Sequence, residues 1–202
     1  MTAISTLAFI LVVLTAMMIL VFRDWRINTI ALGLQYLAVF SLVTLSWPIG
    51  MAVVKLIVGW MATAAIAFTC LRQMKAESPS EPTSSLFFRA IAGILVILVI
   101  FVLSPSLQEA MFPQVPLVII QGGLMLIGMA LMQLGTNSEA YLTIISLLSL
   151  LAGFEVIHAA LELSTLLTGL LVITNLGLAL VGVFFIVKTS DTNEIPGMEE
   201  AQ

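Results

Sequence analysis

The chain has 202 residues, of which 61% are hydrophobic and only 9% are charged, and its mean hydropathy is +1.20. A soluble domain carries roughly a quarter charged residues, so this composition excludes a water-soluble globular protein. A single cysteine excludes an internal disulfide and a cysteine-based metal cluster, and a net charge of −4 without a basic patch argues against a nucleic-acid partner. We therefore expect an integral membrane protein. Continuous apolar runs favour an all-α helical bundle over a β-barrel.

Apolar runs long enough to cross a bilayer, roughly 20 residues each, predict seven spans. In chain order they cover residues 3–22, 27–45, 51–71, 86–103, 116–134, 140–163 and 166–188. Polar or proline-containing segments separate them, and Pro105 falls in the loop expected after the fourth span. The break between the last two spans is the weakest, since only residues 162–165 mark it. We expect one transmembrane helical domain, residues 1–188, followed by a polar acidic cytoplasmic tail, residues 189–202.

The basic residues indicate how the spans are oriented. With the N-terminus outside, the cytoplasmic segments contain six of the seven Lys and Arg residues: Arg23, Arg26, Arg72, Lys75, Arg89 and Lys188. The outer loops then contain none, which is the positive-inside distribution. The first span has no basic segment before it and no small-residue cleavage site, so we expect a retained helix and not a cleaved signal peptide. We predict an outer N-terminus, a cytoplasmic C-terminus and location in a bacterial inner membrane.

Four ionisable residues lie inside the predicted spans, where a charge costs about 2.5–3.5 kcal/mol at the bilayer centre. Lys55 is in the third span, and Glu155, His158 and Glu162 are in the sixth. The spacing i, i+3, i+7 places the last three on one helix face. All four fall in the outer half of the bilayer, so we expect Lys55 to pair with Glu155, directly or through His158 or water. An imidazole between two carboxylates suits a proton path.

Each of these residues also has a structural interpretation. Lys55 could extend its ammonium group toward the outer interface, Glu162 could be interfacial, and His158 could bond to a backbone carbonyl. A buried Glu–Lys pair can also fix the register of two helices without moving a proton. The sequence leaves these alternatives open.

Other residues within the spans suggest helix packing. Gln35, Gln121 and Asn175 are expected to form polar contacts between helices, and Trp25 and Trp47 fall at predicted membrane interfaces. The sequence contains no phosphate-binding glycine loop, no metal-binding histidine pair and no nucleophile elbow. We therefore expect no catalytic site, no metal and no cofactor in this chain.

Two late segments resemble a known helix pair. Residues 153–161 read Gly-Phe-Glu-Val-Ile-His-Ala-Ala-Leu, and residues 174–180 read Thr-Asn-Leu-Gly-Leu-Ala-Leu. They are similar to the small membrane subunit of complex I (the chain 4L family of NADH-quinone oxidoreductase) and to its longer relatives in Mrp-type antiporters and in component E of group 4 hydrogenases. Size and span number are most similar to the hydrogenase component, and Arg26 and Gln35 match its early arginine-flanked helix.

The resemblance implies a subunit that lies between antiporter-like subunits and a hydrophilic arm, with its buried carboxylate in the proton path. Glu155 is the carboxylate that this chain shares with the family. The complex I subunit has a second carboxylate in the next helix, where this chain has Asn175.

Three functions follow from these observations. The first is a non-catalytic membrane subunit of a respiratory or hydrogenase-type ion-translocating complex, with other membrane subunits and lipid as partners. The second is a structural or assembly subunit of another bioenergetic complex, with no ion path of its own. The third is a stand-alone transporter, against which the lack of a detectable repeat counts.

Overall fold

The computed structural model describes residues 3–73, 83–137, 139–162 and 164–193. Within these ranges the chain forms seven helices and no strand: α1 (Ala3–Val21), α2 (Trp25–Val43), α3 (Ile49–Gln73), α4 (Thr83–Met111), α5 (Leu117–Thr136), α6 (Ala140–Leu161) and α7 (Thr165–Asn193). All seven are long and apolar enough to cross a membrane. The expected all-α, seven-span architecture is confirmed, and the chain is an integral multi-pass membrane protein.

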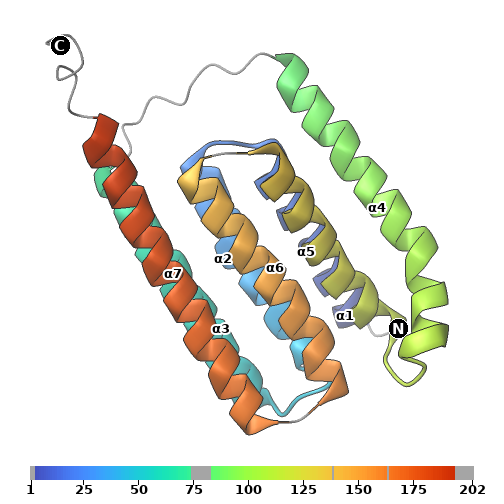
Figure 1. Ribbon diagram of the computed structural model, residues 1–202. Helices are drawn as coiled ribbons and strands as arrows, with labels where there is room; N and C mark the ends of the chain where they lie inside the picture. The colour runs from blue at the N-terminus through green and yellow to red at the C-terminus, as the bar shows by residue number, and fades with distance from the viewer. Residues whose placement is uncertain (1–2, 74–82, 138, 163, 194–202) are drawn as a thin grey trace, which may run out of the picture.

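The helices form two layers (Figure 1). One layer contains α1, α2 and α3 in order, and the other contains α4, α5, α6 and α7. Across the layers, α5 packs on α1, α6 on α2 and α7 on α3, while α4 lies at the edge against α1 and α5. Consecutive helices run in opposite directions, so the two helices of each facing pair are parallel. The last three helices therefore repeat the spatial order of the first three.

Burial varies strongly among the seven helices. The central helices α2, α5 and α6 are the most enclosed, whereas α4 and α7 are the most exposed. Much of the exposed surface of α4 is apolar and includes Phe87, Leu95, Leu98 and Val102. A lipid bilayer covers such a face, because no polar surface is needed there. Buried polar side chains occur on all seven helices.

Two helices, α4 and α7, extend at their C-terminal ends well beyond the predicted spans. Pro105 lies inside α4, although the sequence analysis placed it in a loop. Proline removes a backbone N–H and disrupts most helix interiors, but membrane helices tolerate it because neighbouring groups satisfy the freed carbonyl. Helix α7 continues to Asn193, so residues 189–193 of the expected tail are helical. Residues 194–202 of that tail lie outside the described part.

The weakly marked break between the last two spans is present. Glu162 has an extended backbone and ends α6. Two residues later, the Ser164 hydroxyl accepts a hydrogen bond from the Leu167 N–H at 3.4 Å, which is the geometry of a helix N-cap. This short connection reverses the chain and allows α7 to pack against α6.

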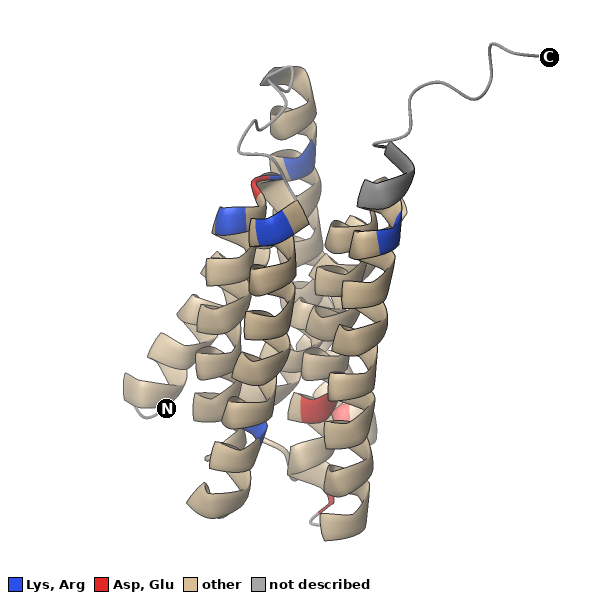
Figure 2. Cartoon of the chain, turned by 90° about the vertical axis from the view of Figure 1, so that its left-hand side faces the viewer, with Lys and Arg blue, Asp and Glu red and all other residues tan. Residues whose placement is uncertain are grey.

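Among the described residues, Lys and Arg positions gather at one end of the bundle, with a single exception (Figure 2). This basic end contains Arg23, Arg26, Arg72, Arg89 and Lys188 from the described residues, and Lys75 lies outside them. Lys55 is the exception and lies toward the opposite end. The predicted orientation is based on this grouping of Lys and Arg residues. That orientation, with the basic end in the cytoplasm, stays a prediction.

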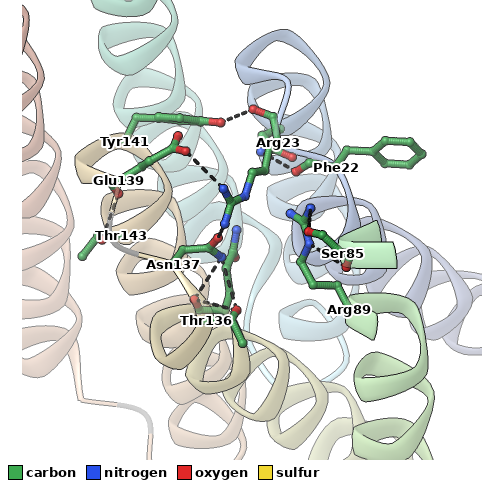
Figure 3. A network of polar contacts seen from close by, with 11 residues as sticks. Phe22, Arg23, Ser85, Arg89, Thr136, Asn137, Glu139, Tyr141 and Thr143 are labelled. Carbon is green, nitrogen blue, oxygen red and sulfur yellow. Dashed lines mark hydrogen bonds and ion pairs between the residues drawn. The ribbon is translucent and has the colours of Figure 1, made fainter. Parts of the chain in front are cut away.

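The turn between α1 and α2 is fixed at the basic end by side chains from the second layer. The last carbonyls of a helix lack partners within it. Here the Gln133 amide donates to the Ile19 carbonyl at 2.9 Å, and the Tyr141 hydroxyl donates to the Arg23 carbonyl (Figure 3). These contacts join α1 to α5 and α6 independently of apolar packing.

Glycines allow α5 and α6 to approach closely. A Cβ atom added at Gly153 would lie 2.7 Å from the Gly123 carbonyl oxygen and 2.8 Å from the Leu126 Cβ. One added at Gly123 would lie 2.4 Å from Ile157 Cγ1. Small residues at such crossings are a common basis of helix association in membranes.

We expect Gly153→Ala to lower the free energy of unfolding by about 1–3 kcal/mol, because a methyl group there meets backbone atoms that cannot rotate away. Gly169→Ala is the matched control, since it is also helical and has nothing within 4 Å of the added Cβ. Thermal unfolding in detergent, followed by circular dichroism, measures both. Equal stability of the two variants would contradict the close crossing.

Candidate functional site

Lys55 and Glu155 form an ion pair in the interior of the bundle. The Lys55 Nζ lies 3.2 Å from the Glu155 Oε2, and each side chain is only 4% exposed. The structure thus brings the two residues together directly, as their predicted depths suggest. The alternative in which Lys55 extends toward the interface is not what the structure shows. The ammonium also lies 5.0 Å from the centre of the Trp47 ring.

Trp47, which is expected at a membrane interface, lies at the end of the bundle and is buried there by the protein. Its side chain lies in the connection between α2 and α3 and is 4% exposed. The electron-rich face of an indole attracts a cation most strongly where water is excluded. Trp47 therefore adds a second favourable contact for Lys55. The sequence of this short connection, in which Trp47 precedes Pro48, gave no indication that the indole would contact Lys55.

Four helices hold the ion pair in place. Lys55 belongs to α3 and Glu155 to α6, which lie diagonally across the two layers, and both α2 and α7 pack against these two helices. Tyr36 of α2 sits against Gly59, one turn along α3 from Lys55, where an added Cβ would lie 2.3 Å from the ring. The Tyr36 hydroxyl donates to Asn175 Oδ1 of α7 at 3.2 Å. It is also close enough to Glu155 to interact with it electrostatically.

The other two ionisable residues of the predicted path form a separate contact nearer the end of α6. His158 Nε2 lies 3.8 Å from Glu162 Oε2; the His158 side chain is 10% exposed and the Glu162 side chain 70% exposed. The imidazole is roughly stacked on the Phe154 ring, with 6.0 Å between their centroids. In the described part of the chain, neither ring nitrogen of His158 has a hydrogen-bond partner. No hydrogen bond or ion pair joins His158 to Glu155 there.

The polar residues expected to join helices differ in whether they form hydrogen bonds. Gln121 donates to the Ser104 hydroxyl at 3.1 Å and joins α5 to α4, and Asn175 accepts from Tyr36. Gln35 is 1% exposed, and neither atom of its amide has a partner among the described residues. Ser149 on α6 is likewise buried with its hydroxyl oxygen unpartnered in that part of the chain.

The site thus consists of a sealed ion pair with a more accessible His–Glu contact on one side. Among the described residues, no cluster of three His, Cys, Asp or Glu side chains could hold a metal ion. No protein-family model, no curated protein and no solved structure matches the chain. The fold and site define a multi-pass membrane protein in which Lys55 and Glu155 form an enclosed pair of opposite charges.

We expect Lys55→Met or Glu155→Gln alone to destabilise the protein by about 3–5 kcal/mol, because each leaves an uncompensated charge in the interior. The double variant Lys55→Met/Glu155→Gln removes both charges and is expected to lose less stability than either single variant. Unfolding in detergent of the four proteins completes a double-mutant cycle. Additive losses would show that the contact does not contribute to folding.

Proposed function

We propose that this chain is a non-catalytic, membrane-embedded subunit of an ion-translocating complex, in which Glu155 binds and releases a proton and Lys55 is its counter-charge. The observation that carries the proposal is the 3.2 Å contact between two side chains that are each 4% exposed. An ionisable residue within a membrane span is costly and marks a functional site by default.

Trp47 supports a role in which the ion pair opens. When Glu155 takes up a proton, its attraction for the Lys55 ammonium falls. The ammonium already lies 5.0 Å from the Trp47 ring in the ion-paired state, and this contact remains as a favourable one when the carboxyl group is neutral.

Polar groups continue from the ion pair toward the basic end. At about 1.5 Å per helical residue, Ser149 lies about 12 Å and Glu155 about 21 Å along α6 from Tyr141, the residue bonded to Arg23. Gln35, about 18 Å along α2 from Arg23 on the same scale, falls between their levels. Buried amides and hydroxyls without a protein partner are the groups that internal water usually satisfies. Such water would extend a proton path from Glu155.

At the opposite end, His158 and Glu162 support access to Glu155 from the membrane surface. Exposure rises along α6 from 4% at Glu155 to 10% at His158 and 70% at Glu162. Histidine changes its charge near neutral pH and transfers protons readily. We assign this end to the outer face of a bacterial inner membrane and the basic end to the cytoplasm, in agreement with the positive-inside rule.

The proposed complex has other membrane subunits as partners. The resemblance of residues 153–161 and 174–180 to the small complex I subunit and to hydrogenase component E supports this assignment. If it is correct, a C-terminally tagged chain extracted gently from its native membrane will co-purify with large multi-span subunits in fixed proportion. Migration as a single species after crosslinking in the membrane would contradict subunit membership and favour a stand-alone transporter.

One observation favours a structural role as the second candidate. His158 and Glu155 share no hydrogen bond or ion pair in the described residues, so the polar groups along α6 are not continuous. A pair that only fixes helix register needs no such continuity. The two candidates differ in what the loss of the carboxylate does to an assembled complex.

We expect Glu155→Gln to abolish the contribution of the assembled complex to the proton or sodium gradient, because the amide cannot exchange a proton. The gradient is measured with a fluorescent dye in everted membrane vesicles, with a strain lacking the chain as the baseline. Glu109→Gln is the control, since it makes the same change at an exposed position on α4. Lys55→Met/Glu155→Gln tests the same point if the single variant assembles poorly. Normal gradients per assembled complex in both Glu155 variants would overturn the proton role and leave the structural one.

A further inference from the structure

A pocket of about 340 Å³ opens at the basic end between the turn after α1, the first turns of α4 and the last turn of α5. Its lining consists of two arginines, three hydroxyl side chains and one aromatic ring: Arg23, Arg89, Ser84, Ser85, Thr136 and Phe88. None of these six residues is acidic. The lining is therefore suited to an anion.

Arg89 is held beside the beginning of α4. It is 3% exposed; its Nη2 donates to the Ser85 hydroxyl at 3.0 Å, and its Nε donates to the Ser85 carbonyl at 3.4 Å (Figure 3). These bonds keep the guanidinium close to the helix N-terminus. The first backbone N–H groups of a helix point outward and favour negative charge. Two sources of positive potential therefore converge on the same pocket.

Arg23 is anchored from the other side by the connection between α5 and α6. Its Nη2 donates to Asn137 Oδ1 at 2.6 Å, and its Nη1 lies 3.4 Å from Glu139 Oε1 (Figure 3). A guanidinium held in this way is oriented before a ligand arrives, which lowers the entropy lost on binding. Planar guanidinium groups match the oxygens of a phosphate particularly well.

The pocket lies at the level expected for lipid headgroups. Helix α4 has 29 residues, about 43 Å at 1.5 Å per residue, against about 30 Å for the hydrocarbon core. Its first turns carry Ser84, Ser85 and Arg89 at the basic end of the bundle, so we place them in the headgroup region. Phe88 is 62% exposed, and Phe87 and Ile91 beside it are also exposed. This apolar face continues from the pocket along the direction of an acyl chain.

We propose that the pocket binds the phosphate group of an anionic phospholipid, with Arg23 and Arg89 on the phosphate oxygens and the acyl chain along α4. Basic pockets between helices at the cytoplasmic surface recognise anionic headgroups by this chemistry. Free inorganic phosphate offers the same oxygens but makes no use of the apolar face. The site is distinct from the Lys55–Glu155 pair and does not depend on the role of that pair.

The test uses Ser84, which is exposed in the first turn of α4. Ser84→Glu places a carboxylate at the pocket without harming the helix, because acidic residues are favourable in a first turn. Ser84→Gln has nearly the same size and no charge. The purified full chain, in neutral detergent, is titrated with dioleoyl-phosphatidylglycerol or dioleoyl-phosphatidylcholine and bound lipid is counted by native mass spectrometry. A parallel titration uses inorganic phosphate alone, followed by calorimetry.

We expect the wild type to bind phosphatidylglycerol more tightly than phosphatidylcholine, and Ser84→Glu to bind it about tenfold more weakly than Ser84→Gln because of like-charge repulsion. Arg89→Gln is expected to show a similar loss, and Arg72→Gln, at an exposed position outside the pocket, none. If the two Ser84 variants bind phosphatidylglycerol equally, the proposal is overturned. If only inorganic phosphate distinguishes them, the anion site stands and a lipid is not its occupant.

Discussion

The enclosed contact between Lys55 and Glu155 sets the constraint on the rest of this bundle. Each charge alone would be strongly unfavourable in an apolar interior, so α3 and α6 must present them at the same depth and facing each other. The two helices lie diagonally, and their relative position depends on α2 and α7. Tyr36 of α2 connects to both α3 and α7, because its ring packs on Gly59 and its hydroxyl donates to Asn175. The site is thus a property of four helices together.

The two ends of the bundle have different chemistry, and each follows from the connections found there. At the basic end, side chains of α5 and α6 bond to the carbonyls at the end of α1, while Arg23 is held by Asn137 and Glu139. Such fixed polar contacts suit a surface that meets charged headgroups. At the opposite end, the connection after α2 buries Trp47 against Lys55. The Lys55–Glu155 pair therefore lies toward the end of the bundle opposite the basic one.

Much of the fold could be predicted because the bilayer imposes strong rules on sequence. Apolar runs of span length gave all seven helices. Helix periodicity predicted one face for Glu155, His158 and Glu162, but only Glu155 and His158 belong to α6, because Glu162 has an extended backbone at its end. Pro105 was misplaced because the rule for soluble helices does not hold where neighbouring helices satisfy a freed carbonyl. The burial of Trp47 against Lys55 could not be predicted, since an indole at the end of a span gives no indication of the side chains that cover it. The packing of helices across the two layers also could not be predicted, because it leaves no periodic pattern in the sequence. These packed pairs are α5 on α1, α6 on α2 and α7 on α3.

The energetics of the ion pair favour a role beyond helix packing. Replacing a buried pair by apolar residues of similar volume is often neutral or stabilising, and in a membrane the helices already have apolar and glycine-mediated contacts for association. Gly123 and Gly153 give α5 and α6 such a contact without any charge. Stability alone therefore does not account for Lys55 and Glu155. The proposed proton role of Glu155 is supported by its burial, by His158 about one turn along α6 and by the exposed Glu162 just past the end of that helix.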